Sequence, residues 1–542
     1  MRAKRSWFGR AWDRVRKSLG RRGYDAADTG RRSSGWGRPA TSANAEIDRA
    51  LALVRGSARE LVRNDAMAAS AVSVIVNNTV GEGIQPRAAF PKGVGDQMLP
   101  ASRLDPAETV NQRCDRIWSE VLETIDASGQ LNAYGQQILA CRGIVESGEA
   151  LLQRHWRRFP ADGLSVPMQV ELLEGDLLDQ SMTKTLEDGR IVQGVEFDGR
   201  GRRVRYWLHP EHPGALVPGS SWTSWGQSSP VPASEISHAY EPLRPGQVRG
   251  MSFLTPVISD LQGFSDYTTT ELERKRLEAC IFASVDGLGG DEYVTGSEAG
   301  ALPALTTDSD GVIQEDLQPG AILYPPEGSA IHVHTPGSVG GVAEFRRQQL
   351  TSIAAGMRLC YTLLTGDLSG TNYSSIRAGL IEFRRFIRSF RQQVFIRLVC
   401  RPQWEWAMEA AQVIGRIPMT DSRGMPIRTF PARWAPPMFE SVDRLKDAQA
   451  DNWELANATT DIGQIILGRG RVPEEVFRDQ SKAIEMLDEL KIPAAWRVFR
   501  PWNVVANEQR DEEPEAAPAA PPPFVDDDDD EDPDESQSEN DE

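Results

Sequence analysis

Residues 363–379, LLTGDLSGTNYSSIRAG, form a loop of small polar residues that leads into a helical pattern. Loops of this composition at a helix N-terminus can hold phosphate groups through backbone N–H donors. A GxxxxGK[ST] nucleotide loop also needs a Lys for the phosphates and a hydroxyl for Mg²⁺. Here Gly366 is followed four residues later by Gly370, and no Lys lies near these glycines. We therefore predict a turn and a helix cap, with a weak backbone anion contact left open.

The sequence contains no other catalytic pattern. Neither GxSxG nor HExxH occurs, and Glu382 beside Arg384 and Arg385 fits surface ion pairs. His332 and His334 alternate on one strand, but spacing places no third metal ligand near them. We therefore predict no enzyme activity, no cofactor and no metal. The five cysteines lie far apart, which favours reduced thiols.

Charge is distributed very unevenly along the chain. The net charge is −18, yet residues 508–542 hold 17 Asp/Glu against one Arg, a net of −16. Residues 1–40 hold 12 Lys/Arg against three Asp, a net of +9, which leaves −11 for residues 41–507. The tail composition predicts disorder. The basic arm could contact nucleic acid, acidic lipid or the tail. It has no apolar region of a secretory signal, and no run elsewhere is long enough to cross a bilayer.

The first half of the chain mixes helical and strand patterns. We predict helices over 46–80 and near 108–126, then strands within 165–179 and 191–210. Asp198-Gly199 supplies a hairpin turn in the second strand region. Thr255 can cap a helix of about 25 residues that has Pro256 in its first turn and that ends before Gly287.

The second half is mainly helical. Two strand-like pieces, AILYPP (321–326) and AIHVHT (330–335), precede a helix over 342–359. The longest helix is expected from about Ser374 to Arg401. Its apolar residues recur by four and three along one stripe: Ile376, Leu380, Phe383, Ile387, Phe390, Val394 and Leu398. Two or three shorter helices are expected over 441–490, the last starting at Pro473.

Five segments together resemble a tailed-phage portal protein of the lambda family. They are ELVRNDAMAASAVSVIVNNTVGEGIQPR (60–87), GVEFDGRGRRVRYW (194–207), RPGQVRGMSFLTPVI (244–258), LTGDLSGTNYSSIRAGLIEFRR (364–385) and VDRLKDAQA (442–450). The resemblance covers roughly residues 50–495, is most specific at 364–385 and is loosest at 286–340. The first 45 residues and the acidic tail lie outside it.

The resemblance implies a fold and an assembly. The expected fold is α+β, mainly α, in a portal-type subunit with wing, stem, clip and crown. Such subunits assemble into a cyclic ring of twelve with a central channel. Double-stranded DNA is packaged through the channel by terminase and is later ejected. The other implied partners are the major capsid or scaffold protein and a head-tail connector protein. The expected location is the portal vertex of the virion, after assembly in the host cytoplasm, without stable membrane insertion.

The order of the segments along the chain assigns a residue range to each of these parts. The expected divisions are a basic arm (1–45), wing (46–250), first stem helix (251–285), clip-like β insert (286–340), second stem helix (341–360), tunnel loop (361–375), long wing helix and return (376–440), crown helices (441–500) and acidic tail (501–542).

The tunnel loop would project into the DNA channel. Its expected channel residues are Gly366, Asp367, Ser369, Gly370, Thr371, Asn372, Tyr373, Ser374 and Ser375. Basic residues that face the channel or a neighbouring subunit are expected among Arg274, Lys275, Arg276, Arg346, Arg347 and Arg377. Ion pairs between subunits are an equally good interpretation. For Arg377, Arg384, Arg388 and Arg391 on the long helix, a subunit contact or a solvated face is favoured over DNA contact.

Two alternatives remain open. One is a nucleic-acid translocase with an unrecognised nucleotide site, which the missing Lys argues against. The other is a membrane-associated ring or scaffold, which Trp7, Phe8 and Trp12 among basic residues make plausible.

Overall fold

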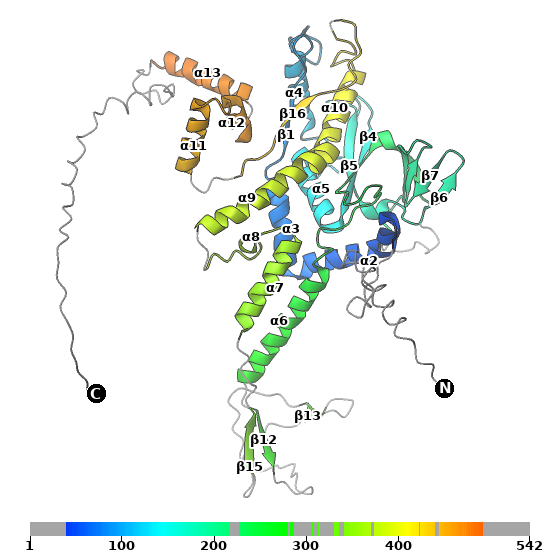
Figure 1. Ribbon diagram of the computed structural model, residues 1–542. Coiled ribbons are helices and arrows are strands. Elements are labelled where there is room, and N and C mark those ends of the chain that lie inside the picture. The colour runs from blue at the N-terminus through cyan, green and yellow to red at the C-terminus, as the bar shows by residue number, and fades with distance from the viewer. Residues whose placement is uncertain are drawn as a thin grey trace, which may run out of the picture. The chain divides into compact units, whose positions relative to one another are not determined.

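The computed structural model describes residues 40–215, 227–279, 341–369, 373–421, 423–439, 444–469, 471 and 473–491, with the backbone of four short strands between 282 and 334 (Figure 1). It divides into two compact units, Met1–Val472 and Pro473–Glu542. The expected basic arm (except residues 40–45), the acidic tail, the AILYPP strand and loop residues 370–372 lie outside the described residues.

The N-terminal helical region is two helices rather than one. They are α2 (Ala43–Asn64) and α3 (Ala66–Thr79). Asp65 between them has extended backbone angles, and its side chain accepts from the Ala68 N–H at 2.8 Å. An Asp in this conformation caps a new helix, so the predicted continuous helix over 46–80 is wrong at this residue.

Two further helices and a three-stranded sheet follow in the first half of the chain. The helix predicted near 108–126 is α4 (Val110–Val121), and Thr109 and Gln112 form its capping box. Helix α5 (Ala133–Ser147) was not predicted. The sheet has the antiparallel order β11–β4–β5, with bounds β4 (Glu149–Trp156), β5 (Met168–Glu174) and β11 (Ile236–Tyr240). Two-stranded ribbons join β1 (Gln85–Ala88) to β16 (Ala432–Ala435) and β2 (Met98–Leu99) to β3 (Glu108–Thr109).

A five-stranded antiparallel sheet follows the first one and has a small core of its own. Its order is β10–β9–β8–β7–β6, from β6 (Lys184–Leu186), β7 (Gly189–Val192), β8 (Val195–Phe197), β9 (Arg203–Leu208) and β10 (Ser229–Pro232). The Asp198 carboxylate accepts from the N–H groups of Arg200 and Arg202 in the loop between β8 and β9. The predicted hairpin turn is therefore confirmed. Single turns of 3₁₀ helix, η2 (Gly175–Leu177) and η3 (Ala233–Glu235), flank the sheet.

Helices α6 (Ile258–Ala279) and α7 (Val342–Gly356) pack side by side (Figure 1). The first helix starts later than predicted. Thr255 and Pro256 lie in the preceding turn, and the Thr255 hydroxyl donates to the Ser252 carbonyl rather than capping a helix. Residues 282–286, expected to extend the helix, instead form β12 (Phe282–Asp286), which pairs with β15 (Ala330–His334). A second ribbon joins β13 (Thr306–Thr307) to β14 (Ile313–Gln314).

The longest helix runs 12 residues beyond its predicted end. It comprises α9 (Tyr373–Phe390), a π-helical section η4 (Arg391–Cys400) and α10 (Arg401–Val413). Short α8 (Tyr361–Thr365) precedes it. Pro402 has no N–H for the Leu398 carbonyl, and the Ser237 hydroxyl of β11 donates to that carbonyl at 2.6 Å instead. The apolar stripe is confirmed, because Phe383, Ile387 and Phe390 are all buried.

Arg391 corrects the expectation of an exposed basic face on this helix. Its side chain is 5% exposed, and it donates to the carbonyls of Asn78 and Thr79, at the end of α3, and of Pro437. The last carbonyls of a helix have no partner within the helix, and a cation is favourable there. Arg391 therefore joins the long helix to α3 and to the segment after β16.

Replacing Arg391 with Lys should lower the free energy of unfolding by about 1–3 kcal/mol, because one ammonium group cannot reach all three carbonyls. Urea denaturation followed by tryptophan fluorescence measures this change. The control is Arg385→Lys, where the side chain is 71% exposed and pairs with Glu382, as predicted for that pair. A shift equal to that of the control would show that the three contacts contribute little.

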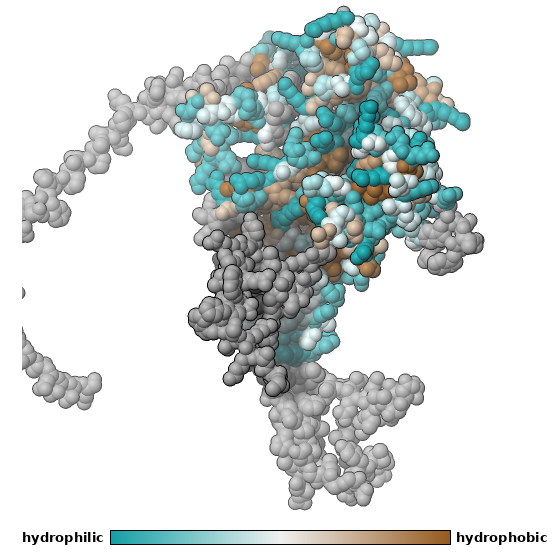
Figure 2. Space-filling view, turned by 45° about the vertical axis from the view of Figure 1, so that its right-hand side comes forward, coloured by the Kyte–Doolittle hydropathy of each residue, from teal (hydrophilic) through white to brown (hydrophobic). Residues whose placement is uncertain are grey.

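Three helices follow β16. They are α11 (Arg444–Ala456), α12 (Ile462–Gly468) and, in the second compact unit, α13 (Pro473–Glu489). This agrees with the prediction for residues 441–490. Hydrophilic residues cover most of the described surface visible in Figure 2, where hydrophobic residues form small separate patches. Across the described residues, none of the helices has the length and apolarity that a bilayer crossing requires.

Candidate functional site

The α6–α7 pair is held by aromatic contacts. The rings of Tyr267 and Phe345 meet edge to face with centroids 4.8 Å apart. The Arg346 guanidinium lies 5.7 Å from the centroid of the Phe264 ring. Leu261 of α6 and Leu350 of α7 are buried and belong to the main core. The two helices are thus anchored to the body at the end where α6 begins and α7 ends.

Most of the candidate basic residues on these helices have partners within the chain. Arg274 pairs with Glu271 at 2.6 Å, and Lys275 contributes to lowering the pKa of the same carboxyl after the larger effect of Arg274. The Arg347 guanidinium lies 5.4 Å from the centroid of the Tyr361 ring. These contacts hold Arg274, Arg346 and Arg347 against their own chain. Arg276 and Arg377 are exposed. It remains a prediction that any of these six basic residues faces a channel.

The described half of the candidate loop is a tight turn around Asp367. Its Oδ1 accepts from the Ser369 N–H at 2.8 Å and from the Ser369 hydroxyl at 2.6 Å. The Tyr361 hydroxyl donates to Oδ2 at 3.1 Å. Gly366 ends α8 with φ +71°, a conformation in which a side chain is strained. The predicted turn is confirmed for residues 366–369.

The turn has consequences for anion binding. Hydrogen bonds from Ser369 and Tyr361 lower the pKa of Asp367, which keeps this carboxylate ionised. The carboxylate occupies the donors that a phosphate would use and adds a negative charge beside them. The chemistry of the turn therefore disfavours a phosphate grip. Gly370, Thr371 and Asn372 lie outside the described residues. The backbone of Tyr373, Ser374 and Ser375 belongs to α9, whose start was predicted at Ser374.

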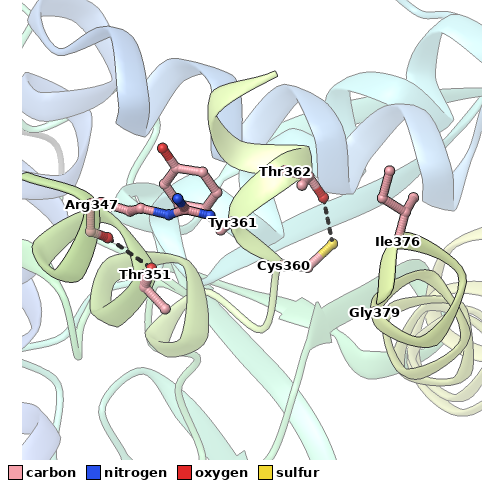
Figure 3. Close-up of a pocket in the computed structure, with 7 residues that line it drawn as sticks. All are labelled: Arg347, Thr351, Cys360, Tyr361, Thr362, Ile376 and Gly379. Carbon is pink, nitrogen blue, oxygen red and sulfur yellow. Dashed lines mark hydrogen bonds between the residues drawn. The ribbon is translucent and has the colours of Figure 1, made fainter. Parts of the chain in front are cut away.

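A pocket of about 180 Å³ lies at the base of this loop (Figure 3). Helices α7, α8 and α9 all contribute to its lining, which consists of Arg347, Thr351, Cys360, Tyr361, Thr362, Ile376 and Gly379. Thr351 donates to the carbonyl of Arg347, and Cys360 contacts the hydroxyl of Thr362 at 3.5 Å. Its one charged group, Arg347, stacks on Tyr361. These residues offer neither a nucleophile–base pair nor a set of metal ligands. We therefore interpret the pocket as part of the side-chain packing at the base of the loop.

A buried ionic cluster lies where the body meets the start of α6. The Glu149 side chain is fully buried and accepts from Arg55 at 2.8 Å, Arg249 at 2.9 Å, His238 at 2.9 Å and the Gly250 N–H at 2.9 Å. Burial raises the pKa of Glu149, but Arg249, His238 and Arg55 together hold it well below its ordinary value. The carboxylate is therefore charged. It ties α2, β4 and β11 to the segment that leads into α6.

The cluster fixes the protonation state of His238. Arg203 can only donate to Nδ1, so the proton is on Nε2 and is donated to Glu149. Burial in this site lowers the pKa of His238 to about 4. Between about pH 6.5 and 4 the unfolded chain therefore binds a proton that the folded chain does not. Stability from the neutral imidazole is present above this window and is lost as the pH falls through it.

The free energy of unfolding should consequently fall by about 2 kcal/mol between pH 7 and 5 because of His238 alone. A His238→Gln variant should lack this part of the pH dependence, whatever its stability at pH 7. Urea denaturation of both proteins at pH 7, 6 and 5 gives the two slopes. Equal slopes would mean that His238 has the same pKa in the folded chain as in the unfolded chain.

One acidic cluster was not predicted from the sequence. One ligand atom each from Glu174, Asp176 and His212 lies within 4.8 Å of the others. Arg59, however, donates to Glu174 at 3.0 Å and to Asp176 at 2.7 Å, so a cation already occupies the position between the carboxylates. The cluster is an ion-pair network. For His332 and His334 only the backbone, in β15, is described.

The model of the phage portal protein lambda family matches residues 29–391. This range is more than half of the chain and includes α6, α7 and the loop before α9. The chain belongs to the lambda family of phage portal proteins. The match begins before residue 50, where the resemblance was expected to start. It ends within the long helix, so the segment at 442–450 lies outside it. The portal-type, mainly α fold expected from the sequence is thereby confirmed.

Individual relatives agree with this family. The chain is 26% identical over 356 residues to the probable portal protein of Halomonas phage phiHAP-1. The aligned region covers 64% of this chain and 65% of that protein. It is 22% identical over 522 residues to the portal protein of Escherichia phage N15, covering 89% and 94%. Portal protein B of Escherichia phage lambda is 21% identical over 401 residues, covering 69% and 72%.

Two solved structures are also similar. The neck of an empty gene transfer agent particle gives a TM-score of 0.37 at 14% identity, covering 82% of this chain and 99% of that chain. A portal protein of the HK97 family from Corynebacterium diphtheriae gives a TM-score of 0.29 at 10% identity, covering 60% and 83%.

Proposed function

We propose that this chain forms a ring at one capsid vertex and that double-stranded DNA passes through the centre of the ring. The observation that supports this most is the family match, which spans both helices of the α6–α7 pair and the loop before α9. We infer that DNA enters during packaging, driven by the large subunit of terminase, and leaves through the same opening at infection.

In this proposal α6 and α7 form the stem, residues 286–340 form the clip and residues 361–375 form the tunnel loop. The clip would contact terminase and later the head-tail connector protein. The wing would contact the major capsid or scaffold protein, and α11 to α13 would form the crown. The ring would have twelve copies. Because a cyclic ring joins two different surfaces of each copy, its interfaces are heterologous.

The chemistry of the described loop fits a passage better than a binding site. Ser369 is small and neutral, and its donors are occupied by Asp367. A moving duplex needs contacts that break at every step, whereas aligned Lys or Arg residues would hold phosphates tightly. A negative body, −11 over residues 41–507, would further repel a duplex from the wall.

The proposal assigns no catalysis to this chain. The purified full-length protein should therefore hydrolyse no ATP, and phosphate release with and without DNA measures this. Turnover above the buffer rate that depends on DNA would instead support a translocase. Flotation with acidic liposomes that is lost on deleting residues 1–22 would support a membrane-associated ring.

A further inference from the structure

Arg358 ends α7 in a conformation that glycine usually provides. The N–H groups of Arg358 and Leu359 donate to carbonyls near the end of α7, a pair of bonds that closes a helix around a left-handed residue. Arg358 has φ +61°, and Gly148 and Gly366 take this conformation after α5 and α8. Ala458 also takes it after α11, so glycine is not essential. A side chain there nevertheless costs backbone free energy, which contacts of that side chain can offset.

The Arg358 side chain contacts three separate parts of the chain. Its Nη1 atom donates to both carboxylate oxygens of Glu241, just after β11, at 3.0 Å. The guanidinium carbon lies 5.3 Å from the centroid of the Phe253 ring, before α6, and 4.9 Å from that of the Phe386 ring of α9. A planar guanidinium can stack on rings while it pairs with a carboxylate. Arg358 therefore joins the end of α7 to the segment before α6 and to the long helix.

The chain that follows Arg358 also lies against α9. Cys360 is the N-cap of α8, two residues later. A Cβ added to Gly379 of α9 would lie 3.3 Å from the Cys360 Cβ, so α8 and α9 meet closely there (Figure 3). Gly379 and Phe386 are seven residues apart, which is about two helical turns and places them on one face. Arg358 and Cys360 thus contact the same face of the long helix at two points.

We propose that Arg358 is a positioning residue that fixes the start of α8, and with it the turn at 366–369, against the long helix. Helix α8 has five residues, too few to be stable without neighbours. Near its end, Leu364 is buried and its carbonyl accepts from the Ser70 hydroxyl of α3. Arg358 supplies the corresponding contacts at its start. The importance of this position for the passage of DNA rests on the proposed function.

Cys360 reports on this position. Among the described cysteines it alone is half-buried, whereas Cys114, Cys141 and Cys400 are buried. The test measures alkylation of each cysteine by iodoacetamide in the full-length protein, with mass spectrometry of the peptides. Arg358→Gly keeps the left-handed backbone and should speed alkylation of Cys360 about tenfold, because one ion pair and two stacking contacts are lost. Losing a cation near a thiol does not by itself speed alkylation, so a faster rate reports access.

Two further variants are the controls. Arg385→Gln removes a guanidinium that pairs with Glu382 at an exposed site of α9, and it should leave the Cys360 rate within about twofold of the native rate. Arg358→Lys keeps the charge beside Glu241 and the two rings. It should bring the rate back to within about threefold of the native rate.

Two results would overturn the proposal. Unchanged alkylation of Cys360 in Arg358→Gly would mean that the backbone turn is sufficient. An equal rise at Cys141 and Cys400 would mean that Arg358 acts only on overall stability.

The proposed function is tested separately with the same variant in a packaging reaction with procapsids and terminase. We expect Arg358→Gly rings to protect about tenfold less DNA from nuclease, in proportion to the loosened position of α8. Faster alkylation with normal packaging would support the positioning role of Arg358 and contradict the role of the loop in DNA passage.

Discussion

Replacing Ser369, Thr371 and Ser374 with Arg is expected to reduce DNA packaging by more than about a hundredfold while rings still assemble. In a ring of twelve copies, each substitution adds a circle of positive charge at the loop. Every added guanidinium can pair with a phosphate and release a counterion, so the duplex would be held instead of advancing. Protection of DNA from nuclease in a packaging reaction with procapsids and terminase measures the loss.

The matched control for this prediction is Ser369→Ala. It removes the hydroxyl that donates to Asp367 but adds no charge, so packaging should stay within a few-fold of the native level. Higher salt should partly restore packaging by the arginine variant, because phosphate contacts weaken with salt. Normal packaging by the arginine variant would exclude the assigned role of the loop. Equal loss in the alanine variant would show that the shape of the turn matters, and not its charge.

The largest effect on stability is expected at Glu149. Replacing it with Gln keeps the shape but removes the only carboxylate that Arg249 contacts in the cluster, and it leaves buried positive charge uncompensated. Breaking a buried ion pair in this way costs about 3–5 kcal/mol. The Glu149→Gln chain should therefore unfold at much lower urea concentration or accumulate as insoluble protein.

Glu171→Gln provides the control for Glu149. Glu171 lies on β5, its side chain is 47% exposed and it contacts His155, so its loss should change the free energy of unfolding by less than about 1 kcal/mol. If the two variants unfolded at the same urea concentration, the Glu149 cluster would not be what joins the body to α6.

The periodic parts of the fold could be predicted from the sequence. The long helix has an apolar stripe at helical spacing because only one side of α9 faces the core, with Phe383, Ile387 and Phe390 buried. Helix α5 has no such stripe. Its buried side contains Gln136 and Gln137 as well as Ala140, and its exposed side contains Ile138 and Leu139. Because polar residues are buried and apolar residues are exposed on this helix, its sequence lacks the apolar stripe that reveals an amphipathic helix.

The charged clusters could not be predicted, because they join distant residues. Glu149 meets Arg55 from 94 positions away and Arg249 from 100 positions away. Arg391 was expected on an exposed face, since nothing local shows that the end of α3, 312 positions away, lies against it. The Asp65 break had a local signal, an Asp before an apolar run, which the long helical pattern concealed. Local propensity identifies elements, whereas their partners depend on the tertiary fold.

The most direct test of the central claim is electron microscopy of the purified full-length protein together with its mass by light scattering. We expect closed rings with a central opening, as cyclic symmetry with heterologous contacts requires, and a mass of about twelve chains. Compact two-fold dimers, or assemblies without a central opening, would contradict it.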